Sequence, residues 1–134
     1  MKYFTIEEME SSNTADRKKI ANHIPEDLIP NMEDLVNNVL DPLREAYGKP
    51  IRVTSGYRCE ALNKAVAGAK NSDHLKACAA DIVGTPNNKA ENRKLFELVQ
   101  SLGLSFRQLI DEYNYSWVHV SYDKTDNKNQ ILHL

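Results

Sequence analysis

The sequence predicts an α+β fold in which N-terminal helices pack on a central antiparallel sheet. Apolar residues recur at helical spacing through the first half of the chain, and the period changes to that of strands after Pro50. Helices gathered early and strands gathered late are typical of this fold class. At 134 residues the chain fits one compact domain, so we expect a single domain over residues 1–134.

Three helices are expected before Pro50. A short one follows Thr5, whose side chain suits a helix cap, and a second covers Ala15–Asn22. A longer helix should follow Pro25, with its leucines and valines on one face. Pro42 should bend or interrupt this helix, and a glycine and a proline after it should end it.

The second half of the chain should supply the sheet. A glycine at position 103 should end the last helix, and a four-residue loop between the last two long strands suits a hairpin. The expected strands are Ile51–Thr54, Ala79–Val83, Arg107–Glu112 and Trp117–Tyr122, with Gln130–Leu134 as an edge strand, and the expected helices are Arg58–Ala67 and Asn87–Leu102.

Charge and composition exclude several classes of partner. Lys and Arg number 17 against 19 Asp and Glu, a net charge of -2, so no broad basic field favours nucleic acid or anionic membrane. No segment is long and apolar enough to span a bilayer, and the N-terminus lacks the apolar run of a signal peptide. Cys59 and Cys78 form no C-x-x-C motif, which argues against a thiolate zinc site and leaves a single disulfide open.

Two of the four histidines stand out because of their neighbours, whereas His23 and His133 are expected to be solvated. His74 precedes a run of small residues that ends in Asp81, inside an expected strand. A carboxylate in an apolar strand is costly unless it is paired or bound to a cation. Two ligands of one zinc ion each lie about 2 Å from it, so the chain would have to turn back between His74 and Asp81. The sequence permits that turn but offers no glycine for it.

His119 is expected to face the same site. It lies in a strand whose alternation places Trp117, His119 and Ser121 on one face and the valines on the other. Because the valines take the core face, the imidazole faces away from the core.

The hairpin register predicts a catalytic carboxylate. If Tyr113–Ser116 is a four-residue loop, Glu112 pairs with Trp117 and becomes a diagonal neighbour of His119, while Asp111 points to the other side. A general base must reach a metal-bound water without being a ligand itself, so this register makes Glu112 the expected base. A different loop length would exchange the two acids.

Simpler interpretations exist for each of these residues. Two imidazoles, one carboxylate and an open position for water are the arrangement of a catalytic zinc site. His119 would otherwise be a half-buried sheet residue, Glu112 a solvent-facing strand end, and Arg58 a surface salt bridge or helix cap. A metal-free domain in which Asp81 simply pairs with Arg58 is a further alternative.

Six ordered blocks of sequence carry a family resemblance. They are Ser55-Gly-Tyr-Arg-Cys59, Leu62-Asn63, Gly68-Ala69 with Asn71-Ser72-x-His74, Ala79-Ala80-Asp81, Gln108-Leu-Ile-x-Glu112 and Trp117-Val-His-Val-Ser121. Together they resemble the zinc D-Ala-D-Ala carboxypeptidase family, and more closely its small branch found in phage endolysins and stand-alone bacterial domains. The resemblance spans roughly residues 28–122 and implies a Hedgehog/DD-peptidase-like fold with zinc in a cleft on the sheet.

The resemblance implies a role for each candidate residue. Zinc ligands would be His74, Asp81 and His119, and Glu112 would be the catalytic acid and base. Arg58 would stabilise the developing oxyanion or hold the substrate carbonyl. Ser72 and Trp117 are expected to contact the substrate, with Asp73 as the alternative polar partner beside Ser72.

The activity implied is zinc-dependent hydrolysis of peptide bonds in peptidoglycan stem peptides by a metal-activated water. Both a carboxypeptidase and an endopeptidase fit. The alternative is a catalytically weak or inactive metal-containing module that binds the cell wall, as the resemblance to the Hedgehog signalling domain suggests for this fold. One departure keeps that alternative open, because Ala77 stands where the family usually has glycine, although we expect the alanine to be tolerated.

The partner and location follow from the same resemblance. The expected partner is a peptidoglycan peptide, with no nucleic acid and no membrane span, and we expect a monomer. Without a signal peptide the chain would reach the cell wall by lysis, in a phage particle or after processing, and would otherwise be cytoplasmic.

Overall fold

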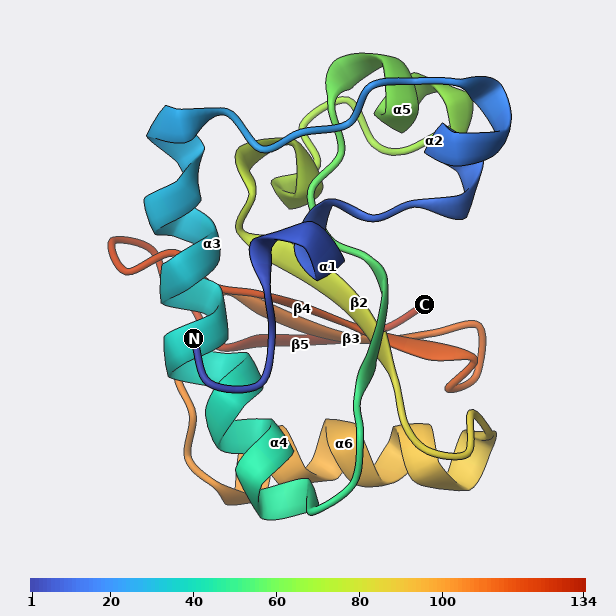
Figure 1. Cartoon of the computed structure of the whole chain (residues 1–134). Helices are drawn as coiled ribbons and strands as arrows, with labels where there is room; N and C mark the ends of the chain where they lie inside the picture. The colour runs from blue at the N-terminus through green and yellow to red at the C-terminus, as the bar shows by residue number, and fades with distance from the viewer.

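The computed structural model describes residues 1–134 and has an α+β fold (Figure 1). Helices cover a five-stranded sheet with the strand order β1-β2-β4-β3-β5. The strands are β1 (Arg52–Ser55), β2 (Ala79–Val83), β3 (Gln108–Glu112), β4 (Trp117–Ser121) and β5 (Gln130–His133). The predicted fold class is therefore confirmed, and β2 has the predicted bounds.

Helices occur where apolar spacing predicted them, with some differences at their ends. They are α1 (Ile6–Glu10), α2 (Asn13–Lys18), α3 (Ile29–Leu35), α4 (Asp41–Tyr47), α5 (Glu60–Ala65) and α6 (Lys89–Ser101), with 3-10 turns η1 (Glu26–Leu28) and η3 (Asp73–Lys76). Thr5 caps α1 with its side chain, as predicted. The prediction of Ala15–Asn22 was wrong at its end, because Lys19 is left-handed with φ of 56° and stops α2. The predicted helix 58–67 is also shorter, because Cys59 is extended.

The long helix of the prediction is divided near Pro42. Between α3 and α4 the chain forms the π-helical turn η2 (Val36–Leu40), in which the Asp41 N–H donates to the Val36 carbonyl. Pro42 has no N–H for the carbonyl four residues earlier, so the α-helical bonding pattern cannot pass it unchanged. Gly48 then ends α4 with φ of 74°. Both the interruption and the stop are confirmed.

The sheet is mixed, which corrects the prediction of an antiparallel sheet. β1, β2, β4 and β3 pair antiparallel in succession. β5 adds to the free edge of β3 and runs parallel to it. Both edges of β4 are already occupied, and of the two remaining edges β5 takes that of β3. Because β3 runs opposite to β4, a strand that also runs opposite to β4 is parallel to β3.

Helices and sheet enclose a continuous hydrophobic core. In Figure 1, α3 and α4 run along one side of the sheet, while α6 passes across its lower end. Leu35 of α3, Leu95 of α6 and the β4 residues Val118 and Val120 are fully buried in this core. His119 lies between those two valines and therefore projects from the opposite face of the sheet, as predicted. None of the helices combines the length and the apolar character needed to cross a bilayer.

Candidate metal centre and cleft

His74 lies on the turn η3, immediately before β2. The Ser72 Oγ begins the turn by accepting a hydrogen bond from the His74 N–H at 3.2 Å. Ala77 ends it in the left-handed region with φ of 58°, and its N–H donates to the His74 carbonyl. The reversal required between His74 and Asp81 is thus made by an alanine, at a conformational cost of about 1 kcal/mol.

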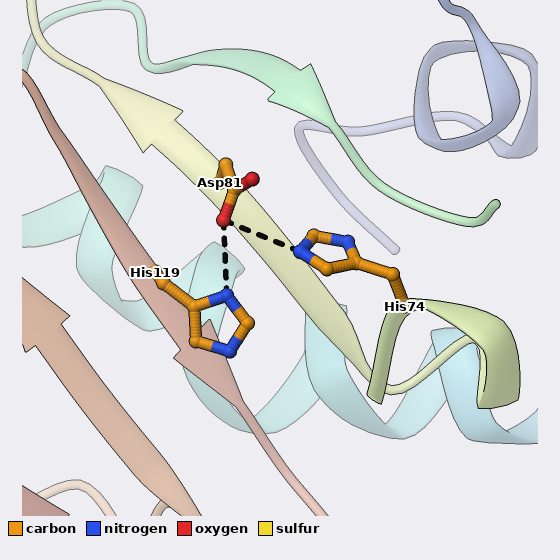
Figure 2. Close-up of side chains that lie close together, drawn as sticks. All are labelled: His74, Asp81 and His119. Carbon is orange, nitrogen blue, oxygen red and sulfur yellow. Dashed lines mark hydrogen bonds and ion pairs between the residues drawn. The ribbon is translucent and has the colours of Figure 1, made fainter. Parts of the chain in front are cut away.

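Asp81 and His119 lie side by side on neighbouring strands. Asp81 of β2 pairs directly with His119 of β4, so both side chains project from one face of the sheet. His74 reaches the same point from η3, and ligand atoms of all three residues lie within 4.8 Å of one another. Figure 2 shows both imidazoles directed at the Asp81 carboxylate. The three nominated ligands therefore form one buried cluster.

The separations within this cluster suit a tetrahedral metal site. Asp81 Oδ1 lies 3.0 Å from His119 Nδ1 and 3.3 Å from His74 Nε2. Zinc bonds of about 2.0–2.1 Å at tetrahedral angles place neighbouring ligand atoms about 3.3 Å apart. Two imidazoles and one carboxylate also leave a fourth position, which is the donor set of many catalytic zinc sites.

The protonation of His74 adds an electrostatic argument for a cation. Its Nδ1 lies 2.6 Å from the Gly56 carbonyl oxygen, which can only accept, so Nδ1 carries the proton. Nε2 of the neutral ring then presents a lone pair, and it is buried without a hydrogen-bond partner. Opposite it lies Asp81 Oδ1, another acceptor. Two buried acceptors at this distance repel each other unless a proton or a metal cation lies between them, and this set of donor atoms fits a bound metal.

The surroundings of Asp81 keep its carboxyl ionised. Burial alone would raise the pKa of Asp81, but its surroundings outweigh burial, the hydrogen bond with His119 first among them, and hold that pKa below its ordinary value. Arg58 Nη2 lies 3.5 Å from the second oxygen, Oδ2. The alternative Arg58–Asp81 pair thus exists, but it leaves Oδ1 directed at both imidazoles. An ionised carboxylate is the form that ligates metals.

Glu112 lies where the hairpin register predicted. The loop between β3 and β4 is Tyr113–Ser116, and Glu112 pairs with Trp117. Asp111 points to the other side of the sheet, where its carboxylate contacts His133 of β5. The predicted register is confirmed, and it brings Glu112 rather than Asp111 to the face that holds the cluster.

Arg58 is the cation beside the cluster and pairs with Asp81. Its side chain is only 14% exposed, so the cation is largely fixed in place. Burial lowers the pKa of the Arg58 guanidinium, and the charges of Asp81 and Glu112 oppose that effect. The arginine therefore stays charged beside the cluster and within the field of both acids.

The candidate residues share one cleft of about 640 Å³. Arg58, His74, Glu112 and His119 line it, and so do Ser72 and Trp117, the two residues predicted to contact the substrate. Ser72 already uses its Oγ to cap η3, and the Trp117 ring packs against exposed Tyr113 with 5.2 Å between ring centroids. The structure thus brings all the predicted site residues to this cleft or to the metal cluster beside it.

Three further contacts near the cluster were not predicted. Arg107 Nη1 donates to the buried carboxylate of Asp73 at 2.7 Å, and its Nε donates to Asp126 at 3.3 Å. Asn63 Oδ1 accepts from Arg58 Nη1 at 3.0 Å. Asp73 precedes the first ligand and Asn63 belongs to a block of the family resemblance, but neither pattern identifies the partner of these side chains.

A ligand cluster with a spare position beside an open cleft is the arrangement of metal-dependent hydrolases. Comparison with protein families agrees with that class, because residues 2–121 match the family described as Peptidase M15. The chain therefore belongs to the M15 family of zinc D-Ala-D-Ala carboxypeptidases, as the resemblance predicted. The match begins before residue 28 and so includes the first helices. No curated protein matches the chain.

Proposed function

We propose that the protein hydrolyses peptide bonds in the stem peptides of bacterial peptidoglycan, with zinc held by His74, Asp81 and His119. One observation gives the main support for the metal site. The buried Nε2 of His74 has no hydrogen-bond partner and lies 3.3 Å from Asp81 Oδ1. Membership of the M15 family supports a zinc metallopeptidase. The choice of peptidoglycan as the substrate is more specific than peptidase activity, and it rests on the resemblance to cell-wall enzymes.

Each of the residues in the cleft has a separate role in the proposed hydrolysis. Bound zinc would act as a Lewis acid and would lower the pKa of the water molecule that attacks the peptide bond. Glu112 borders the cleft outside the ligand cluster, so its carboxylate is free to take a proton from that water and return it to the leaving amine. Arg58 donates to the carbonyl oxygen as negative charge develops there. Ser72 and Trp117 line the cleft, where they would contact the peptide.

The charges of the cleft favour an internal bond over a terminal one. A carboxypeptidase recognises the free carboxylate of its substrate, which usually requires an available cation. Arg107 is the second arginine that lines the cleft, but Asp73 and Asp126 already accept its hydrogen bonds. We therefore favour cleavage within the stem peptide or cross-bridge, with removal of terminal D-Ala as the slower reaction.

A binding module with a retained metal site is the alternative function. Ala77 favours it, because a left-handed alanine ends the turn that carries His74 where the family usually has glycine. A displaced His74 would weaken catalysis more than binding, because catalysis depends on the geometry within the cluster.

A peptidoglycan digest tests the proposal and its alternative. Purified peptidoglycan is incubated with the protein, with or without a chelator, and the soluble fragments are analysed by mass spectrometry. New internal termini that disappear with chelator and in His119→Ala support the endopeptidase, and release of D-Ala alone supports the carboxypeptidase. Sedimentation with peptidoglycan without any new termini would overturn the hydrolase and favour the binding module.

A further inference from the structure

The guanidinium of Arg58 is held by acceptors from three separate segments. Its Nε donates to the Ser55 Oγ at 3.0 Å, its Nη1 donates to Asn63 Oδ1 at 3.0 Å, and its Nη2 lies 3.5 Å from Asp81 Oδ2. A guanidinium has five N–H donors in a rigid plane, so three fixed contacts define both its position and its orientation. Two donors remain for a substrate oxygen.

Asn63 uses both ends of its side-chain amide. While Oδ1 accepts from Arg58, Nδ2 donates to the Ala69 carbonyl at 3.0 Å. The Asn63 carbonyl also accepts from the Gly68 N–H at 2.8 Å, and the residue is only 6% exposed. A buried amide with each end satisfied has one orientation. Asn63 therefore ties Arg58 to the loop that forms one wall of the cleft.

The backbone of Gly68 lies directly against this pair. A Cβ added there would lie 2.0 Å from Asn63 Oδ1 and 2.6 Å from Arg58 Nη1. The loop thus leaves no space in which the Arg58–Asn63 contact could shift toward it. Gly68 also lines the cleft, so the same contact sets the distance between the cleft wall and the arginine.

We propose that Asn63 is a positioning residue that orients Arg58 for the developing charge on the substrate oxygen. This inference rests on the proposed hydrolysis and on Arg58 as the group that meets that oxygen. Asn63 itself does not line the cleft, so its effect on the reaction passes through Arg58.

A double-mutant cycle tests the proposal. Asn63→Ala should lower kcat by about 10- to 100-fold, the range in which small misplacements of catalytic groups fall. In an Arg58→Ala background the same substitution should have no further effect, because there is no arginine left to orient. Asn63→Asp loses the hydrogen bond to the Ala69 carbonyl but keeps an acceptor for Arg58, so it should retain more activity than Asn63→Ala. Asn37→Ala, an exposed asparagine of η2, is the matched control and should keep the wild-type rate.

One control separates this proposal from a general loss of structure. The zinc-dependent rise in melting temperature should be the same in wild type and Asn63→Ala, since Asn63 touches none of the ligands. Equal losses of kcat from Asn63→Ala in both backgrounds would overturn the proposal, because the residue would then act independently of Arg58.

An activity-free measurement distinguishes failure of this inference from failure of the proposed function. The Arg58 Nε–H signal in a nitrogen-proton NMR spectrum, assigned from its absence in Arg58→Lys, should be sharp in the wild type and broadened in Asn63→Ala. An unchanged signal would refute the positioning role even if the wild type hydrolyses no peptide. A broadened signal in a protein without hydrolytic activity would retain the positioning role and remove only the proposed reaction.

Discussion

Zinc should stabilise the folded protein with a slope that can be worked out in advance. The unfolded chain does not assemble His74, Asp81 and His119, so zinc binds the folded state, and each tenfold rise in free zinc above the dissociation constant adds about 1.4 kcal/mol. An unfolding entropy of about 2.1 cal/mol/K per residue gives about 0.28 kcal/mol/K for 134 residues. The melting temperature should therefore rise by about 5 °C per tenfold increase in zinc.

Differential scanning fluorimetry in zinc buffers measures this slope directly. His119→Ala removes the nitrogen that lies 3.0 Å from Asp81 Oδ1, so its melting temperature should stay flat over the range in which the wild type responds. Glu112→Gln keeps every ligand and should show the wild-type slope. If zinc raises the melting temperature of His119→Ala with the same onset and slope as the wild type, the ions bind elsewhere and the three-ligand site is refuted.

Three further predictions concern individual side chains. Glu112→Gln should keep zinc but lower the rate of peptide hydrolysis by about 100-fold or more, and a wild-type rate would remove Glu112 as the base. Hydrogen bonds from Lys49 and other neighbours lower the pKa of Glu91 to about 2 from 4.5, so its stabilising effect is complete above pH 4.5 and lost as the pH falls towards 2. Urea unfolding at a series of pH values should show this acid loss in the wild type and a smaller one in Glu91→Gln, and equal losses would contradict it. The two cysteines are free, and burial raises the pKa of Cys78 to about 12, so a thiol reagent should modify Cys59 first and Cys78 only after unfolding.

Local patterns in the sequence were sufficient for much of the fold and for the face of the sheet that carries the site. Alternation predicted that His119 projects away from its two valine neighbours, and loop length predicted that Glu112 pairs with Trp117. Both patterns depend on residues within a few positions of each other. The parallel pairing of β5 was beyond them, because it depends on which edge of the sheet is free once the other strands have paired.

Contacts between distant residues account for most of what the sequence did not predict. The Gly56 carbonyl that fixes the proton of His74, and the Asn63 side chain that holds Arg58, are identified only by three-dimensional position. Composition and spacing indicate which residues could make such contacts, but they do not show which of many possible partners each residue contacts. The metal ligands were easier to predict, because a buried acid needs a cation or a partner, and the two histidines lie in family blocks beside it.

The turn before β2 shows how contacts between distant residues can stabilise a conformation for which a glycine was expected. A left-handed alanine costs about 1 kcal/mol relative to glycine, so Ala77 alone would favour a relaxed turn and a displaced His74. The same turn is held at its other end by Asp73, whose carbonyl accepts from the Cys78 N–H at 3.2 Å and whose buried carboxylate accepts from Arg107 at 2.7 Å. A charge-assisted hydrogen bond in such a setting contributes about 1.5–3 kcal/mol, which is enough to offset the alanine. The position of the first ligand thus depends on an ion pair to Arg107, next to β3, rather than on a glycine within the turn.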